Sequence, residues 1–169
     1  MVLSSFMAGL AFGNLFAGRF GHRVKNPIRL YGLLEIVIGV AGVALVVLLP
    51  QFNSILAPVL RPWIDRPEIL NPLRLSISFA LMLPATMAMG ATLPLMVKGL
   101  KSADVQFGER LGRLYACNTL GAMAGAMICE MLLITQFGLL GSGFVAGGIN
   151  LLIGLFAFAV GKASTTDRS

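Results

Sequence analysis

Between Arg74 and Lys98 the chain runs through Leu75–Val97 without one charged side chain. A helix that rises about 1.5 Å per residue needs about 20 mostly apolar residues to cross a hydrocarbon core about 30 Å thick. Four other stretches of the chain are nearly as apolar. The pattern predicts an all-α protein, a polytopic transmembrane helical bundle whose main solvent is lipid.

The overall composition agrees with that class and excludes others. Hydrophobic residues make up 57% of the sequence and charged residues 12%, whereas about 25% of residues are charged in soluble domains. The net charge of +6 could indicate nucleic-acid binding, but the basic residues form short clusters between apolar spans and have no interleaved aromatic residues. We therefore expect the lipid bilayer as a partner, and no nucleic acid.

Charge clusters and Gly or Pro signals divide the apolar sequence into spans. The predicted spans cover about residues 2–18, 29–49, 75–97, 114–135 and 139–161. Residues 162–169 would form a tail. The segment 51–71 contains Pro58, Pro62 and Pro67 together with charged residues and Trp63. Because proline interrupts helical hydrogen bonding and tryptophan favours the membrane interface, this segment is expected to be an interfacial loop.

The basic residues predict which ends of the spans face the cytoplasm. Those expected on one side lie in the first connection, the third connection and the tail: Arg19, Arg23, Lys25, Arg29, Lys98, Lys101, Arg110, Arg113, Lys162 and Arg168. The positive-inside rule then places the C-terminus in the cytoplasm and the N-terminus outside, in a multi-pass protein of the cell (inner) membrane. Nothing positive precedes the short first span, so we expect a longer protein whose first helix is missing.

The sequence offers few groups for catalysis or metal binding. Cys117 and Cys129 fall in one predicted helix about 18 Å apart, too far for a disulfide. The single histidine, His22, has no cluster of Cys, Asp or Glu at ligand spacing. We therefore expect no cofactor, no metal site and no catalytic constellation within this chain.

Small residues four positions apart mark faces where helices can pack closely in lipid. Three such pairs are Gly9/Gly13, Gly121/Gly125 and Gly143/Gly147. Gly121 and Gly125 share a helical face with Asn118, so that face should meet a neighbouring helix. Pro84 and Pro94 are expected to kink the span over 75–97.

Polar residues inside the spans are the candidates for lining a cavity or coupling transport: Glu35, Asn118, Glu130 and Asn150. Glu35 lies about 9 Å along its helix from Arg29, and Glu130 about one turn from the outer end of its span. An acid inside the membrane is a functional candidate by default. The alternatives are pairing of Glu35 with a basic residue at the cytoplasmic rim, and hydrogen bonding of Asn150 to a neighbouring helix.

The first connection reads Gly18-Arg19-Phe20-Gly21-His22-Arg23-Val24-Lys25-Asn26-Pro27. This segment resembles the cytoplasmic loop motif of the major facilitator superfamily, in which the motif joins the second and third helices. His22 stands where that family usually has an aspartate, and Val24 replaces a glycine. The alternative is a basic loop that only fixes orientation. The motif residues of interest are Gly18, Arg19, His22 and Arg23.

A second resemblance covers most of the chain and rests on three blocks in order: Phe6 to Asn14, Met89 to Leu95, and Gly112 to Ala122. Together they resemble the membrane region of the spermidine synthase-like fused transporter family, in which a facilitator-like bundle precedes a soluble aminopropyltransferase-like domain. The departure is at Cys129-Glu130-Met131, where a small residue, a glycine and an aromatic would be expected. The soluble domain has no counterpart here, so the chain is not expected to be an enzyme.

Three functions remain open at this point. The first is a transport-related, partial facilitator-like half for a polyamine or another small solute. The polyamine identity rests on the resemblance. Such a half needs another membrane half or a homo-oligomer to enclose a path. The second is a non-transporting membrane anchor or regulatory domain of a soluble aminopropyltransferase-like enzyme partner. The third is a structural subunit of a larger membrane complex.

Overall fold

A computed structural model describes residues 2–99 and 106–166, and every regular element in that part of the chain is helical. The helices are α1 (Val2–Phe20), α2 (Pro27–Leu60), α3 (Pro67–Gly99), α4 (Phe107–Ile128) and α5 (Ile134–Thr166). Two 3₁₀ turns cover Gly21–Arg23 and Arg61–Trp63, and a π-helical segment, Cys129–Leu133, joins α4 to α5. The predicted all-α class is confirmed. Lys101, Arg168 and the side chain of Lys162 lie outside the described part.

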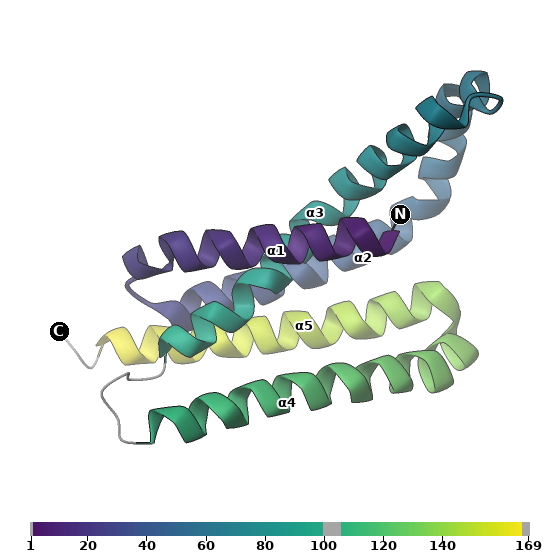
Figure 1. Cartoon of the computed structure of the whole chain (residues 1–169). Helices are drawn as coiled ribbons and strands as arrows, with labels where there is room; N and C mark the ends of the chain where they lie inside the picture. The colour runs from purple at the N-terminus through teal and green to yellow at the C-terminus, as the bar shows by residue number, and fades with distance from the viewer. Residues whose placement is uncertain (1, 100–105, 167–169) are drawn as a thin grey trace.

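Three helical stretches are long and apolar enough to cross a membrane: Pro27–Phe52, Pro67–Gly99 and Phe107–Gly161. Their length and composition indicate association with a membrane. The third stretch contains Gly138, whose φ of 64° lies outside the helical range. Glycine adopts this backbone conformation without the steric cost that a Cβ would impose. The chain reverses direction between α4 and α5 (Figure 1), close to the predicted connection around residues 136–138.

The prediction of a loop over residues 51–71 was wrong for most of that segment. Helix α2 continues through Pro50 and Pro58 to Leu60, and α3 begins at Pro67 and includes Pro72. A proline inside a helix removes one N–H donor and crowds the carbonyl four residues earlier, which disturbs one turn, and a proline at the first position of a helix is favoured. The ends of α2 and α3 therefore project together as a helical arm beyond the other helices (Figure 1).

The helices pack mainly in two pairs, α1 against α3 and α2 against α5. A further contact between α2 and α3 joins the two pairs. The buried apolar residues are mostly small or aliphatic: Ala17, Ile38, Leu70, Ala88, Ala91 and Leu95. The accessible surface is 11543 Å², against roughly 8,000 Å² for a compact soluble protein of this mass. The helices thus form an open layer with much apolar surface exposed.

Helix α4 is the least packed element. None of its residues is buried, and its main contact in the described part of the chain is the π-helical segment that follows it. Long apolar side chains such as Leu120, Met123 and Met127 are more than half exposed. In water this exposure would be costly, whereas in lipid it costs little because the acyl chains are equally apolar.

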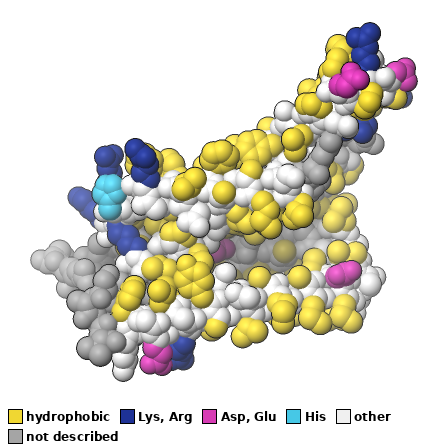
Figure 2. Space-filling model, in the orientation of Figure 1, with side chains coloured by type: hydrophobic (Ala, Val, Ile, Leu, Met, Phe, Trp, Pro, Cys, Tyr) yellow, Lys and Arg dark blue, Asp and Glu magenta, His cyan; other side chains and the backbone are white. Residues whose placement is uncertain are grey.

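Charged side chains gather mainly towards opposite ends of the molecule, with a hydrophobic surface between them (Figure 2). The connection 21–26, the beginning of α4 and the end of α5 lie at one end, and the 3₁₀ turn Arg61–Trp63 lies at the tip of the helical arm (Figure 1). Successive helices run antiparallel (Figure 1). The first connection therefore lies at the same end of the molecule as the beginning of α4 and the end of α5.

Candidate functional site

A central cavity of about 280 Å³ lies among α1, α2, α3 and α5. Residues from the middle of three helices line it, within 38–46 of α2, 82–89 of α3 and 143–150 of α5. Phe6 of α1 also lines it. These positions are near the midpoints of α2, α3 and α5. The cavity therefore lies about halfway along these three helices.

Small side chains keep this cavity open. Gly42 and Ala146 line it on α2 and α5, and Ala85 lines it on α3. A Cβ on Gly42 would have no heavy atom within 4 Å, which shows that the space beside this glycine is unfilled. By contrast, a Cβ on Gly143 would lie 2.9 Å from a Val46 methyl carbon, so the wall there is closely packed.

Two side chains bring polar atoms to the cavity wall, Thr86 and Asn150. The Thr86 hydroxyl donates to the carbonyl oxygens of Met82 and Leu83, at 2.9 and 3.3 Å. In the described part of the chain the Asn150 amide has no hydrogen-bond partner. The predicted bond from Asn150 to a neighbouring helix is therefore not observed there. Asn150 offers the cavity both a donor and an acceptor.

Glu35 lies outside this cavity. It is half-buried on α2, and the hydroxyl of Tyr31, one turn earlier, donates a hydrogen bond to its carboxyl group. Among the described residues it forms no ion pair, so the predicted pairing with a basic residue at the rim is not observed there. The sequence analysis missed Tyr31, although its spacing of four positions from Glu35 is the signal for such a contact.

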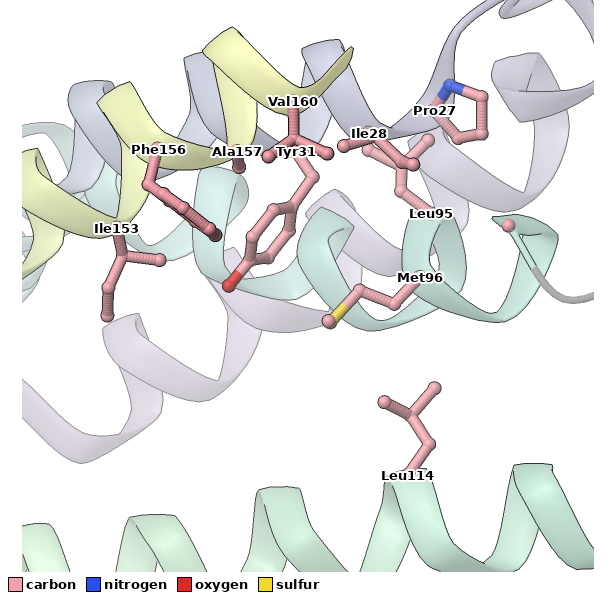
Figure 3. A pocket seen from close by; sticks show the side chains of 11 residues that line it. Pro27, Ile28, Tyr31, Leu95, Met96, Leu114, Ile153, Phe156, Ala157 and Val160 are labelled. Carbon is pink, nitrogen blue, oxygen red and sulfur yellow. The ribbon is translucent and has the colours of Figure 1, made fainter. Parts of the chain in front are cut away.

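Tyr31 lines a second space, the lateral groove, of about 440 Å³ between α4 and the helices α2, α3 and α5. Figure 3 shows its ring near Phe156 of α5 and Met96 of α3, with Leu114 of α4 across the gap. Apart from Tyr31, every side chain along the groove is apolar. The groove is thus a lipid-like surface with one hydroxyl group.

Comparisons with protein families, with curated proteins and with solved structures find no match. The fold and the geometry of the site therefore carry the functional argument. The resemblance to the spermidine synthase-like family remains a prediction.

The remaining predicted polar candidates lie elsewhere. Asn118 is exposed on α4, and Glu130 is exposed in the π-helical segment. The structure does not bring Glu35, Asn118, Glu130 and Asn150 into one site, and Asn150 alone of the four lines the central cavity. Cys117 and Cys129 are free thiols. No group of three or more His, Cys, Asp or Glu that could hold a metal ion occurs within residues 2–99 and 106–166.

The first connection is held by a lysine that the sequence analysis did not connect with it. The Lys98 ammonium group, near the end of α3, donates to the carbonyl oxygens of Gly21 and Val24, the latter at 2.9 Å. The motif residues Gly18, Arg19, His22 and Arg23 are exposed. The Arg23 guanidinium lies 5.8 Å from the centre of the Phe20 ring. Lys98 thus ties the loop to α3 without an acidic motif residue.

A second tie joins the beginning of α2 to the end of α5. The Asn26 side chain accepts a hydrogen bond from the Arg29 backbone N–H at 3.2 Å and donates one to the Gly161 carbonyl at 2.8 Å. Asn26 therefore caps α2 and also fixes α5 beside it. The Arg29 guanidinium lies 5.4 Å from the centre of the Phe158 ring, within the range of a cation–π contact.

Two of the three predicted glycine pairs lie at helix contacts. A Cβ on Gly9 would overlap Thr86, and one on Gly13 would overlap the Met87 backbone. Gly143 and Gly147 face Val46 and Val43 of α2. Gly121 and Gly125 face open space in the described structure. The neighbour expected for that face of α4 is therefore not found there.

Proposed function

We propose that this protein is an integral membrane protein that takes part in the transport of a small solute. The observation that carries the proposal is the central cavity, which α2, α3 and α5 line near their midpoints and to which α1 contributes Phe6. Cavities at this depth, lined by kinked or proline-containing helices, are where transporters hold substrate. Pro84 lies within the part of α3 that lines the cavity.

In this proposal five helices cross the membrane, with α4 and α5 as separate spans on either side of Gly138. Helix α1 would be the fifth span, although it is not among the three stretches of membrane length and hydropathy. The basic residues around the first and third connections support a cytoplasmic location of these connections in a protein of the cell (inner) membrane. The arm between α2 and α3 and the turn at Gly138 then face outward.

A polyamine is suggested solely by the resemblance to the spermidine synthase-like family. None of the side chains that line the central cavity is charged. Glu35 could neutralise the charge of a cationic solute, but it does not line the central cavity. It contacts Tyr31, which lines the lateral groove instead. A facilitator path also requires a second half, which another chain or a second copy would supply.

Solute uptake into proteoliposomes tests the transport role. We expect a radiolabelled small neutral solute to enter with the parent protein, and Asn150→Leu to reduce that uptake at least fivefold, with spermidine uptake measured beside it as the test of the polyamine suggestion. Glu35→Gln separates a coupling role from a structural one, because the amide keeps the hydrogen bond from Tyr31 but cannot bind or release a proton. Glu130→Gln, exposed and remote from the cavity, is the matched control. No uptake by the parent protein would contradict the transport role and favour the anchor function.

The exposure of α4 favours a second candidate function, a structural subunit of a larger membrane complex. The face with Asn118, Gly121 and Gly125 has open space beside it, and a polar amide in lipid is stabilised by a partner helix. Blue-native electrophoresis in mild detergent tests this function. A larger assembly that Gly121→Leu dissociates would support it, and a lone monomer would count against it.

A further inference from the structure

The walls of the central cavity specify the chemistry of what it can hold. Along α2 they are wholly apolar, with Ile38, Leu45 and Val46 beside Gly42. Neither a carboxylate nor a basic group is among the lining residues. Bringing an ion into such a place without a counter-charge is strongly unfavourable. The cavity therefore disfavours a charged ligand.

The polar groups of the cavity wall limit further which ligands the cavity can bind. Thr86 is only 2% exposed, and its hydroxyl proton is already directed to the backbone of its own helix. Asn150 is left as the group that can both donate and accept, and in the described part of the chain it makes no hydrogen bond. A ligand with one hydroxyl or amide group would satisfy this side chain, since an unmatched polar group in apolar surroundings is costly.

The size of the cavity is compatible with a small molecule. An apolar cavity of about 150 Å³ already holds benzene, and this one measures about 280 Å³. It has room for a ring or a short branched chain that carries one polar group. A long extended ligand would not fit within the cavity and would project beyond it.

We infer that the central cavity is a binding site for a small, uncharged, mainly apolar molecule whose single hydrogen-bonding group meets Asn150. As the substrate site of a transporter, this assignment rests on the proposed function. As a binding site, it can be tested without any transport. It also separates this chain from the polyamine chemistry that the sequence resemblance suggests, because a polyamine carries several positive charges.

Two methionines that line the cavity provide a direct readout. Met82 and Met89 lie in its wall, whereas Met123 and Met127 are exposed on α4, do not line the cavity, and report non-specific partition of the probe into the nanodisc lipid. The protein is labelled at its methionine methyl groups with ¹³C, placed in lipid nanodiscs and titrated with benzyl alcohol, toluene and spermidine. Benzyl alcohol should shift the Met82 and Met89 signals saturably, whereas the shifts of Met123 and Met127 should be smaller and should rise linearly with concentration.

The probes distinguish the parts of the inference. Toluene, which lacks the hydroxyl group, should bind roughly threefold to tenfold more weakly than benzyl alcohol. Spermidine should leave Met82 and Met89 unchanged. Asn150→Leu should remove the preference for benzyl alcohol over toluene. Saturable spermidine binding at Met82 and Met89 would overturn the inference, as would shifts of equal size at all four methionines.

A variant that fills the cavity and a control variant that does not can be compared for ligand binding. Gly42→Leu extends a side chain into the unfilled space and should abolish binding, whereas Gly148→Leu, at another glycine with open space around it that does not line the cavity, should not. Gly42→Ala is the milder second variant if the first does not fold, and should weaken binding. Unchanged affinity in the folded Gly42 variant would overturn the inference. Binding without uptake would leave this site in place and contradict only the transport role.

Discussion

Gly32 in α2 and Gly154 in α5 face each other, and the carbonyl oxygen of each lies 2.7 Å from the point that a Cβ on the other would occupy. The relationship is reciprocal because the two helices pack backbone against backbone. Further along the same contact, Gly39 faces Gly147, and Gly161 faces Arg29. Close approach of this kind gains dispersion contacts that lipid cannot supply in the same way.

A methyl group at Gly154 should separate these helices. Because the atom it would meet is backbone, the strain cannot be relieved by a change of rotamer, and we expect Gly154→Ala to destabilise the fold by about 1–3 kcal/mol. Gly148→Ala on the same helix meets open space and should change stability by less than about 0.5 kcal/mol. Thermal unfolding in detergent compares the two. Equal stability of the two variants would show that α2 and α5 do not pack as described.

The contact between Lys98 and the first connection leads to a prediction about that loop. Lys98→Met removes the donor to the carbonyls of Gly21 and Val24 and should loosen the turn by about 1 kcal/mol, since one end of the bond is charged but exposed to solvent. Hydrogen exchange of the Val24 amide, which bonds the same Gly21 carbonyl at 3.1 Å, should then become about fivefold faster.

The control for this experiment is Lys25→Met, which removes the same charge from the loop itself. Lys25 is exposed, so its replacement should leave exchange at Val24 nearly unchanged. The same acceleration in both variants would mean that net charge, and not the bond from Lys98, holds the turn.

The hydrogen bond from Tyr31 to Glu35 should contribute to stability. Tyr31→Phe leaves the half-buried carboxyl group without its donor and should cost about 1 kcal/mol. Glu35→Gln retains an acceptor for the hydroxyl and should cost less. Tyr115→Phe, at the exposed tyrosine of α4, is the control. Chemical unfolding in detergent measures all three, and a loss at Tyr31 no greater than at Tyr115 would argue against the bond.

The helical class and the turn near Gly138 could be predicted from the sequence because both depend on local chemistry. A long apolar run has few alternatives to a helix in lipid, since backbone groups there must be paired internally. Gly138 follows Gln136 at a break in the apolar pattern, and it has the φ of 64° that favours glycine. The glycine pairs at spacing four in α1 and α5 were likewise visible, and both meet partners.

The rest of the packing could not be predicted, because it depends on which helix lies beside which. The glycines at Gly32 and Gly39 in α2, and at Gly147 and Gly154 in α5, recur at spacing seven, and three of them belong to none of the predicted pairs at spacing four. Pro58, Pro62 and Pro67 suggested a loop, yet Pro58 lies inside α2 and Pro67 begins α3.

The functional residues divide in the same way. Asn150 was a candidate because of its own chemistry, and it does line the central cavity. That Asn118 and Glu130 would lie away from it could not be derived, because α4 stands apart from the other helices. Lys98 acts through contacts with residues 74 and 77 positions away, which the sequence does not reveal, whereas the spacing of Tyr31 from Glu35 could have indicated their contact.

Labelling of single cysteines by a membrane-impermeant reagent tests the central claim most directly, namely that these helices cross a membrane with the basic connections on one side. In a background of Cys117→Ala and Cys129→Ala, the exposed positions His22, Glu109 and Asp65 are each replaced by Cys. We predict that His22→Cys and Glu109→Cys are labelled only from the cytoplasmic side, and Asp65→Cys only from the outside. Labelling of His22→Cys and Glu109→Cys from opposite sides, or of all three from the same side, would contradict the account.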